Sequence, residues 1–502
     1  MLQQNWYNDG NKYVSWIFSN LKKAFLLFDL LFIAFIFLKG LYAVIGFVIF
    51  ICLSYLLHKN KNSHEQSKKP LVITPRIKRL YTTLIIIYAL IIFFCVFFKY
   101  NEDYLGYYFA FIGLLLYINW FILIIANIMN KPIEKMVFNH YKRMAKNKLV
   151  SMTNLKRVAI TGSYGKTSTK NILNEILNVK YNSFTTEKSF NTMNGLMISI
   201  NNKLDKFTDI FVSEMGAFRR GEIKEKCDFI EPEYGILTTI GSAHLETFGC
   251  MENTQKAKFE LIESLPENGI AVLNKDDGYQ TSYKIQSKCK KVWVSLKDKN
   301  ADVYADNIKL SNKGTSFTCH IKETKDSFDV ETKLLGNANV YNILESIAMA
   351  YELGLNSEEI KVGVKRIKPI EHRLELRRLG DINIIDDAYN SNPVGSSMAV
   401  DVLGMMDGKK IIVTPGMIEL GDKQYEYNME FGRHIAKVCD EVILIGKEQT
   451  KPIQDGLKKE NYDENKIHIL NDVKDAFVLM RKLSRGETYV LLENDLPDIF
   501  NE

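Results

Sequence analysis

The chain has 502 residues, of which 46% are hydrophobic and 25% charged, and its formal net charge is +6. This length suits about two to four domains, and the averages exclude wholesale disorder, a collagen-like chain and a small disulfide scaffold. Much of the small charge excess lies beside apolar segments, so we expect no nucleic-acid binding. The seven cysteines form no C-x-x-C pair, which is typical of small apolar filler in a reducing compartment.

Long apolar stretches come first in the chain. They lie at about 24–38, 41–57, 80–98 and 105–126. A helix that crosses the hydrocarbon needs roughly 20 apolar residues, which the third and fourth stretches supply and which flanking residues can complete for the first. We therefore predict an α-helical membrane domain of four transmembrane segments over residues 1–130. Buried core helices are the alternative, although the run LIIIYALIIFFCVFF has no polar face.

Basic residues set the expected orientation of these segments. The loop after the second stretch holds seven Lys or Arg residues between 59 and 79 against one acid, and a basic linker covers 131–150. By the positive-inside rule, both termini and the catalytic domains face the cytoplasm, so we predict a multi-pass protein of the cytoplasmic membrane. Asp29 lies inside the first stretch, where it is either a functional carboxylate or the end of a short helix.

A short strand, a glycine turn and a helix follow from residue 156. The strand Val158–Ile160 precedes T-G-S-Y-G-K-T-S-T-K, and the helical run NILNEIL follows it. This layout places backbone N–H groups and a helix N-terminus against phosphate, in a shortened G-x-x-G-K-T form. A chance Gly/Lys turn is the alternative. We assign nucleotide binding to Gly162, Ser163, Gly165, Lys166, Thr167 and Ser168.

Later strand-like runs suggest a mostly parallel sheet with helices on both faces. They lie at 210–212, 234–237, 382–385, 410–414 and 441–445, with an antiparallel excursion between 292 and 332. Glu214 follows the first of these runs, where a carboxylate beside a phosphate turn suits Mg²⁺. His244 follows the second, although a lone histidine is more often structural.

Further motifs extend this pattern over about residues 158–421. They include N-T-M-N-G from Asn191, VSEMGAFRRGEI, TTIGSAHLETFG, QKAKFELI, VLNKDD, NANVYN, HRLE, DDAYNSNP and GMIELG, in that order. In this order they resemble the Mur ligase family, ATP-dependent amide ligases of cell-wall precursor synthesis, and within it the D-alanyl-D-alanine-adding type. The resemblance implies a P-loop Mur-ligase central domain over 151–369 and a Rossmann-like C-terminal domain over 370–502.

The resemblance also implies roles for individual residues. Nucleotide contacts are implied for Lys166, Thr167, Asn274, Asn339, Asn342, Arg373, Asp387 and Tyr389. Two Mg²⁺ ions are implied, the first held by Thr167 and Glu214 and the second contacted by His244. Substrate contacts are implied at Asn191, Asn390 and Asn392. Catalytic roles are implied for Lys166, His244, Lys258 and Arg373, with Lys258 carried as a carbamate; a solvated helix lysine is the alternative there.

Two departures from the family put its usual substrates in question. The apolar stretches stand where the family has its carrier-binding domain. The C-terminal segment is acidic at Glu493, Asp495 and Asp498, where the cell-wall enzyme has a basic loop. Such a segment suits an amine or a cationic group, or it is a solvated tail.

The expected function is a membrane-anchored carboxylate–amine ligase that uses ATP and Mg²⁺. A carboxylate attacks the γ-phosphorus of ATP, and an amine displaces phosphate from the acyl phosphate. The expected partners are the bilayer, a lipid-linked or envelope acceptor, and an amino acid or short peptide. A polymerising ligase similar to poly-γ-glutamate synthases, or a non-catalytic membrane nucleotide-binding protein, is the alternative.

Overall fold

The structure is a computed structural model that describes residues 10–19, 27–63, 71–99, 104–380, 382–388, 392–418 and 420–494. Four residues singled out in the sequence, Tyr389, Asn390, Asp495 and Asp498, lie outside the described residues. The chain divides into two units, Met1–His140 and Tyr141–Glu502.

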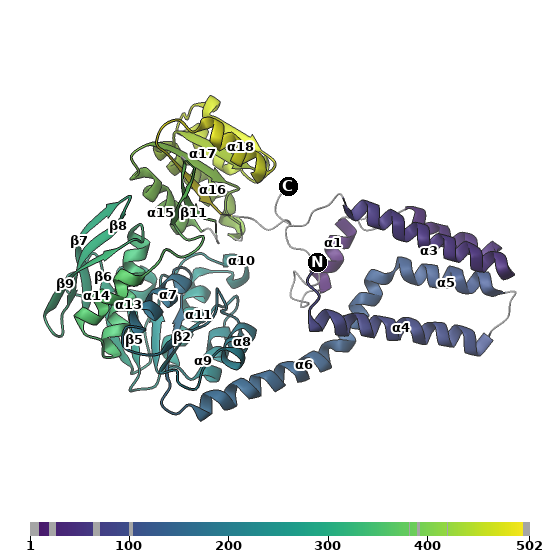
Figure 1. Ribbon diagram of the computed structural model, residues 1–502, viewed down its shortest axis with the longest axis horizontal. Coiled ribbons are helices and arrows are strands. Elements are labelled where there is room, and N and C mark those ends of the chain that lie inside the picture. The colour runs from purple at the N-terminus through teal and green to yellow at the C-terminus, as the bar shows by residue number, and fades with distance from the viewer. Residues whose placement is uncertain are drawn as a thin grey trace. The chain divides into compact units, whose positions relative to one another are not determined.

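The first unit consists of helices. They are α1 (Gly10–Ser19), the 3₁₀ helix η1 (Leu27–Phe37), α3 (Gly40–Ser63), α4 (Pro75–Lys99), α5 (Leu105–Tyr117) and α6 (Asn119–Ser151), the last of which continues into the second unit (Figure 1). The predicted basic linker over 131–150 is thus part of a continuous helix. One buried cluster joins α1, α4 and α6, and another joins η1, α3 and α5.

Two helices of the first unit are long and apolar enough to cross a membrane. They are Gly40–Lys59 and Pro75–Phe94. Helices α5 and α6 together are also long and apolar enough for one span, but the chain bends by 70° at the break between them. The first predicted stretch forms only the 11 residues of η1. A 3₁₀ helix of that length rises about 22 Å, short of the roughly 30 Å of hydrocarbon. The predicted count of four spans is therefore not confirmed; the described residues give two, or at most three.

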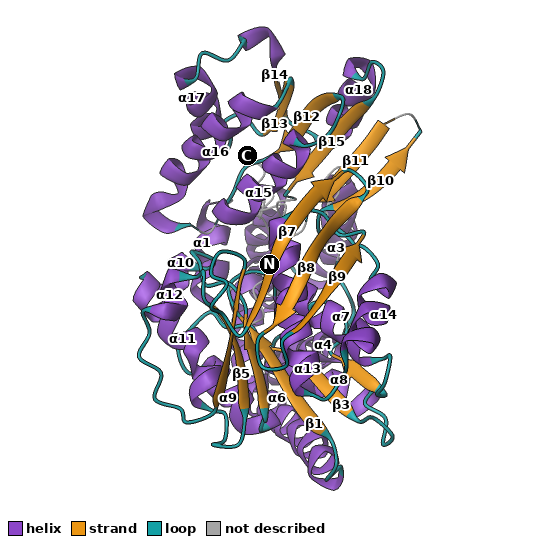
Figure 2. Ribbon diagram, turned by 90° about the vertical axis from the view of Figure 1, so that its left-hand side faces the viewer, coloured by secondary structure: helices purple, strands orange, loops and turns teal. Residues whose placement is uncertain are grey.

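The second unit contains a nine-stranded sheet, whose strands are drawn in orange in Figure 2. Its strands are β1 (Lys156–Thr161), β2 (Ser183–Thr185), β3 (Ile210–Glu214), β4 (Tyr234–Leu237), β5 (Ile270–Asn274), β6 (Lys290–Ser295), β7 (Val303–Ser311), β8 (Gly314–Ile321) and β9 (Asp326–Thr332). Their order is β2-β3-β1-β4-β5-β6-β7-β8-β9. The pairs up to β6–β7 are parallel and the last two are antiparallel, as the sequence predicts.

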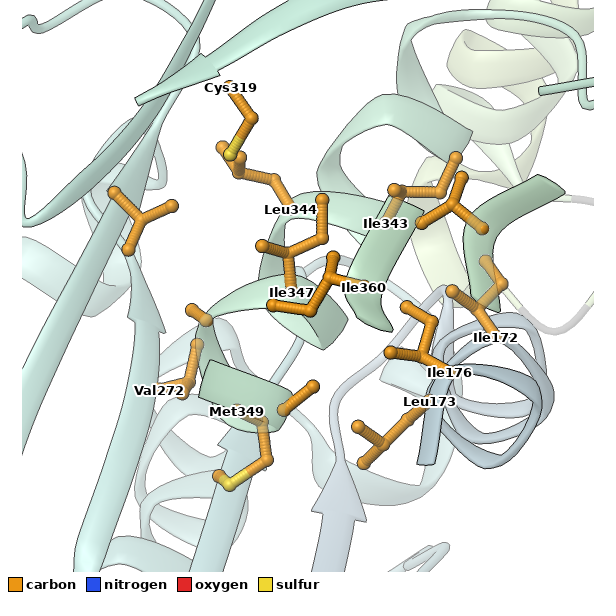
Figure 3. Packing of buried hydrophobic residues seen from close by; sticks show 14 of the residues in the cluster. Ile172, Leu173, Ile176, Val272, Cys319, Ile343, Leu344, Ile347, Met349 and Ile360 are labelled. Carbon is orange, nitrogen blue, oxygen red and sulfur yellow. The ribbon is translucent and has the colours of Figure 1, made fainter. Parts of the chain in front are cut away.

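Helices cover this sheet and supply its core. They are α7 (Lys166–Leu177), α8 (Met193–Asn202), α9 (Glu222–Ile230), α10 (Leu245–Phe248), α11 (Met251–Glu263), α12 (Gly278–Thr281), α13 (Asn337–Glu352) and α14 (Ser357–Arg366). Figure 3 shows Ile172 and Ile176 of α7 beside Ile343 and Ile347 of α13 in the largest cluster. Because α13 packs on α7, its first turn lies close to the glycine turn that begins α7.

The C-terminal part forms a second sheet of six strands in the order β10-β11-β15-β12-β13-β14. The strands are β10 (Glu375–Leu379), β11 (Ile382–Asp387), β12 (Lys409–Thr414), β13 (Glu441–Ile445), β14 (Ile467–Leu470) and β15 (Thr488–Glu493). The helices are α15 (Pro393–Gly404), η3 (Gly421–Lys423), α16 (Gln424–Val438), α17 (Lys451–Lys459), η4 (Glu464–Lys466) and α18 (Val473–Leu483). All pairs except β10–β11 are parallel.

The parallel strands of the second sheet end at one edge, which places Asp386, Asp387 and Glu493 near one another. The mixed α/β class is as predicted, and the two sheets fall on either side of the predicted boundary at 369/370. The P-loop and Rossmann-like descriptions stay predictions.

Candidate functional site

The turn between β1 and α7 requires glycine at two positions. Gly162 has φ +152° and Gly165 has φ +82°. A Cβ on Gly162 would lie 1.9 Å from Thr238 Oγ1, and one on Gly165 would lie 2.5 Å from Asn342 Oδ1. Neither position has room for a side chain, so the backbone itself forms the surface of the turn. The N–H groups at the start of α7 follow directly, as anion binding requires.

Lys166 folds back over this turn. Its Nζ donates to the carbonyl oxygens of Gly162 and Ser163, each at 2.9 Å. Burial lowers the pKa of Lys166 to about 8; Glu214 opposes the shift and Arg373 adds to it. The ammonium is thus held close to the turn, in surroundings where an anion would stabilise its charged form.

Glu214, at the end of β3, contacts three polar side chains near the turn. Thr167 Oγ1 donates to its Oε2 at 3.0 Å, and Asn191 Nδ2 donates to its Oε1 at 3.2 Å. The third partner is Lys170, whose Nζ lies 3.2 Å from Oε2. The structure therefore brings together three predicted site residues, Thr167, Asn191 and Glu214.

Lys170 is the residue that the sequence analysis missed. Its side chain is 0% exposed and that of Glu214 is 1% exposed. The signal was available, because Lys170 ends the motif T-G-S-Y-G-K-T-S-T-K and lies one helical turn after Lys166. Burial lowers the pKa of Lys170, and the ion pair with Glu214 opposes that shift.

The oxygens of Thr167 and Glu214 fit a hard cation such as Mg²⁺. Among the described residues, no three His, Cys, Asp or Glu side chains gather as a metal-binding group. Mg²⁺ is commonly held by one or two carboxylates together with substrate phosphates and water. Thr167 and Glu214 are therefore enough protein ligands for one Mg²⁺ ion. The ring of His244 lies beside that of Phe218, with centroids 4.4 Å apart and ring planes inclined by 56°. Its role toward a second ion stays a prediction.

Lys258, on α11, is a buried amine. Its side chain is 2% exposed, and its Nζ lies 5.5 Å from the ring centroid of Phe248. Burial holds the pKa of Lys258 well below its usual range, and the positive charges of Lys166 and Lys226 lower it further. The neutral amine is the form that adds CO₂, so the surroundings suit the predicted carbamate.

Two predicted base-side residues lie on the first turns of α13. Asn342 Nδ2 donates to Asn339 Oδ1 at 3.3 Å, and Thr169 Oγ1 donates to Asn342 Oδ1 at 3.2 Å. These bonds place both amides beside the glycine turn. Asn274 makes a structural contact. Its Oδ1 accepts a hydrogen bond from the N–H of Asp276 at 2.9 Å, and this bond stabilises the turn after β5. Its contact with a base stays a prediction.

Arg373 links the C-terminal part to the glycine turn. Its Nη2 donates to Thr167 Oγ1 at 3.4 Å. Nearby, burial raises the pKa of Asp387 to about 6, against the N–H of Leu374 and the charge of Arg373. Asn392 caps α15 by accepting from the N–H of Gly395 at 2.8 Å. That bond gives Asn392 a structural contact, and its substrate role stays a prediction.

Comparison with known proteins matches both parts of the second unit. Residues 160–350 match the family model of the Mur ligase middle domain, and residues 372–493 match that of the Mur ligase, glutamate ligase domain. Between them, the two ranges contain Glu214, Lys258 and Arg373.

Individual relatives agree with these models. The chain is 33% identical over 294 residues to UDP-N-acetylmuramoyl-tripeptide–D-alanyl-D-alanine ligase of Escherichia coli, a match that covers 58% of this chain and 64% of that protein. It is 30% identical to the protein of the same name from Buchnera aphidicola subsp. Baizongia pistaciae, over 67% of this chain and 74% of the relative. Among solved structures it is similar to MurF ligase of Thermotoga maritima in complex with ADP, with a TM-score of 0.64 and 26% identity over 71% of this chain and 80% of that one.

Proposed function

The chain belongs to the Mur ligase family, whose members are ATP-dependent, ADP-forming amide ligases, and we propose that it activates a carboxylate as an acyl phosphate and joins it to an amine. One observation carries the proposal. Arg373 of the C-terminal part reaches Thr167 at the glycine turn, where Lys166 and Glu214 also lie. A nucleotide phosphate and its metal ion require this combination of donors and acceptors.

The charges at the turn suit phosphoryl transfer. Lys166 and Arg373 place two positive groups where negative charge gathers in the transition state. Thr167 and Glu214 would hold Mg²⁺, which supplies further charge neutralisation when bound. Lys258, as a carbamate, would add an anion at a position that otherwise holds a buried amine. The fixed positions of these groups reduce the reorganisation that the reaction requires.

The relatives' names suggest the class of substrates. They join a UDP-N-acetylmuramoyl-tripeptide to D-alanyl-D-alanine, and the match spans a little under two thirds of the Escherichia coli protein. For this chain, we propose that the acid is a peptidoglycan-type envelope precursor and that the amine belongs to an amino acid or short peptide. We propose that this acid is attached to a lipid carrier, because the first unit has apolar helices.

The first unit would lie in the cytoplasmic membrane, with both termini and the second unit in the cytoplasm. The membrane location is supported by the two 20-residue apolar spans in α3 and α4, most of whose residues are not buried inside the protein. Ile85, for example, is 68% exposed in the isolated chain. A surface of this kind is stable in a bilayer and costly in water.

The experiment is a phosphate-release assay on membranes that contain the full chain. ATP, Mg²⁺ and an N-acetylmuramoyl-tripeptide acid, linked either to a lipid carrier or to UDP, are supplied with D-alanyl-D-alanine, other dipeptides or single amino acids. We expect ADP and phosphate to form only when both acid and amine are present. Lys166→Ala should abolish release, whereas Lys203→Ala, which removes an exposed lysine on the same unit, should not. ATP binding without amine-dependent release would instead support a nucleotide-binding protein, and long products would support a polymerising ligase.

A further inference from the structure

Glu345, on α13, is a buried acid that the proposed ligase chemistry does not use. The residue is 1% exposed, and its Oε1 has no hydrogen-bond partner among the described residues. Burial holds the pKa of Glu345 well above its usual range; Thr169 opposes this shift and the charge of Asp277 adds to it. A carboxyl group that is buried beside another acid is more stable in its neutral form, which carries a proton.

A chain of hydrogen bonds leads from the backbone just before α13 to this acid. Asn339 Nδ2 donates to the carbonyl oxygen of Leu335 at 2.8 Å, and Asn342 Nδ2 donates to Asn339 Oδ1 at 3.3 Å. Thr169 Oγ1, from α7, donates to Asn342 Oδ1 at 3.2 Å and lies 3.4 Å from Glu345 Oε2. The chain therefore connects Glu345 to two amides that lie beside the glycine turn.

The backbone end fixes the direction of this chain. A carbonyl oxygen can only accept, so Asn339 turns its NH₂ group to Leu335 and its oxygen to Asn342. Asn342 then turns its oxygen to Thr169, and this bond uses the single hydroxyl proton of Thr169. The hydroxyl is left with lone pairs on the side of Glu345. Only a protonated carboxyl group can donate to them.

The direction matters because the oxygen of Asn342 lies against the glycine turn. A Cβ on Gly165 would lie 2.5 Å from Asn342 Oδ1, so an NH₂ group in place of that oxygen would push the turn away. We propose that Glu345, as a neutral acid, donates to Thr169 and so holds Asn342 in the orientation that nucleotide binding requires. Glu345 is thus a positioning residue. This role rests on the proposed function, in which the glycine turn binds ATP.

Calorimetric titration of the full chain with ATP and Mg²⁺ tests the role. Glu345→Leu fills a similar space and cannot donate, so it should weaken ATP binding about tenfold, as expected when a buried hydrogen-bonding group loses its partner. Glu345→Gln keeps a donor and should retain the wild-type affinity. Ser346→Ala is the matched control, since it removes a buried hydroxyl of the same helix that lies outside the chain. Unchanged affinity in Glu345→Leu, or an equal loss in Glu345→Gln, would overturn the proposal.

A second variant covers failure of Glu345→Leu to fold. Thr169→Val breaks the chain at its next member and should also weaken ATP binding about tenfold. Adding Glu345→Leu to it should cost little more, because both side chains act through one hydroxyl group. Unchanged affinity in Thr169→Val, or fully additive losses in the double variant, would show that the chain does not position the nucleotide.

Infrared difference spectra of the wild type and Glu345→Gln, recorded without nucleotide, test the proton itself. At neutral pH, we expect the wild type to show the C=O stretching band of a carboxylic acid that Glu345→Gln lacks. A carboxylate band in its place would overturn the proposal. Because neither the spectra nor the titrations measure phosphate release, these outcomes are separate from those that test the ligase.

Discussion

Lys170 and Glu214 form a fully buried ion pair beneath the glycine turn, with Nζ and Oε2 3.2 Å apart. The same carboxylate accepts from Thr167 and Asn191. One lysine thus compensates the charge of the residue expected to hold the metal ion, and it fixes the direction of the carboxylate. Lys170 is therefore a positioning residue in our account.

Replacing Lys170 should be costly because it leaves a buried carboxylate without its cation. We expect Lys170→Met to lower the free energy of unfolding by about 3 kcal/mol, as measured by denaturant titration. Adding Glu214→Gln should recover most of that stability, since the lone charge is then gone, but it should not restore phosphate release. Additive losses in the double variant would show that the two side chains are not coupled.

The low pKa of Lys166 predicts how nucleotide binding depends on pH. The lysine is charged below about pH 8 and loses its proton as the pH rises through that value. Phosphate favours the charged form, so ATP affinity should stay level below pH 8 and fall above it. Calorimetric titration of the full chain measures this. Lys166→Arg keeps its charge throughout and should remove the pH dependence, even if its affinity is lower.

The buried amine of Lys258 should take up CO₂ at neutral pH. An ordinary lysine is almost fully protonated there, whereas the pKa of Lys258 lies well below its usual range. After incubation with ¹³C-bicarbonate, we expect a carbamate signal in the NMR spectrum of the wild type and none in Lys258→Arg. If the two proteins give the same spectrum, Lys258 remains an amine.

Arg373 should matter to turnover more than to folding. Its Nη2 reaches Thr167 from the C-terminal part, and the residue is only partly buried. We expect Arg373→Ala to lower kcat about 100-fold or more with little change in melting temperature, because the lost charge acts mainly in the transition state. A rise in KM alone would assign Arg373 to ground-state binding.

Membrane insertion can be tested through one side chain. Ile85 lies within the apolar span Pro75–Phe94 and is exposed. An arginine there should oppose insertion by about 3 kcal/mol and raise the fraction of protein extracted from membranes by alkaline carbonate. Ile198→Arg, at an exposed position of α8 in the second unit, is the matched control. Equal extraction of the wild type and both variants would argue against a spanning α4.

Local pattern was enough to predict several strands of the second unit. The strand at 234–237 and the strand at 441–445 have the predicted bounds, because each is a short apolar run at a buried position of a parallel sheet. The motif around Lys166 likewise predicted the glycine turn, and in the structure its two glycines have no room for a side chain.

Some contacts between distant residues were beyond sequence reasoning. Lys170 meets Glu214 across 44 positions of the chain, and nothing in either local pattern states that pairing. The first unit shows another limit, since hydropathy gave the apolar stretch at 24–38 but not its short 3₁₀ form.

An isotope label shows whether the chain activates an acid by phosphorylating it. The acid identified by the phosphate-release screen is labelled with ¹⁸O in its carboxylate and turned over with ATP and the amine. One carboxylate oxygen attacks the γ-phosphorus and leaves with the phosphate when the amine displaces it. We therefore predict ¹⁸O in inorganic phosphate and unlabelled ADP; ¹⁸O in AMP, or unlabelled phosphate alongside the amide product, would contradict the account.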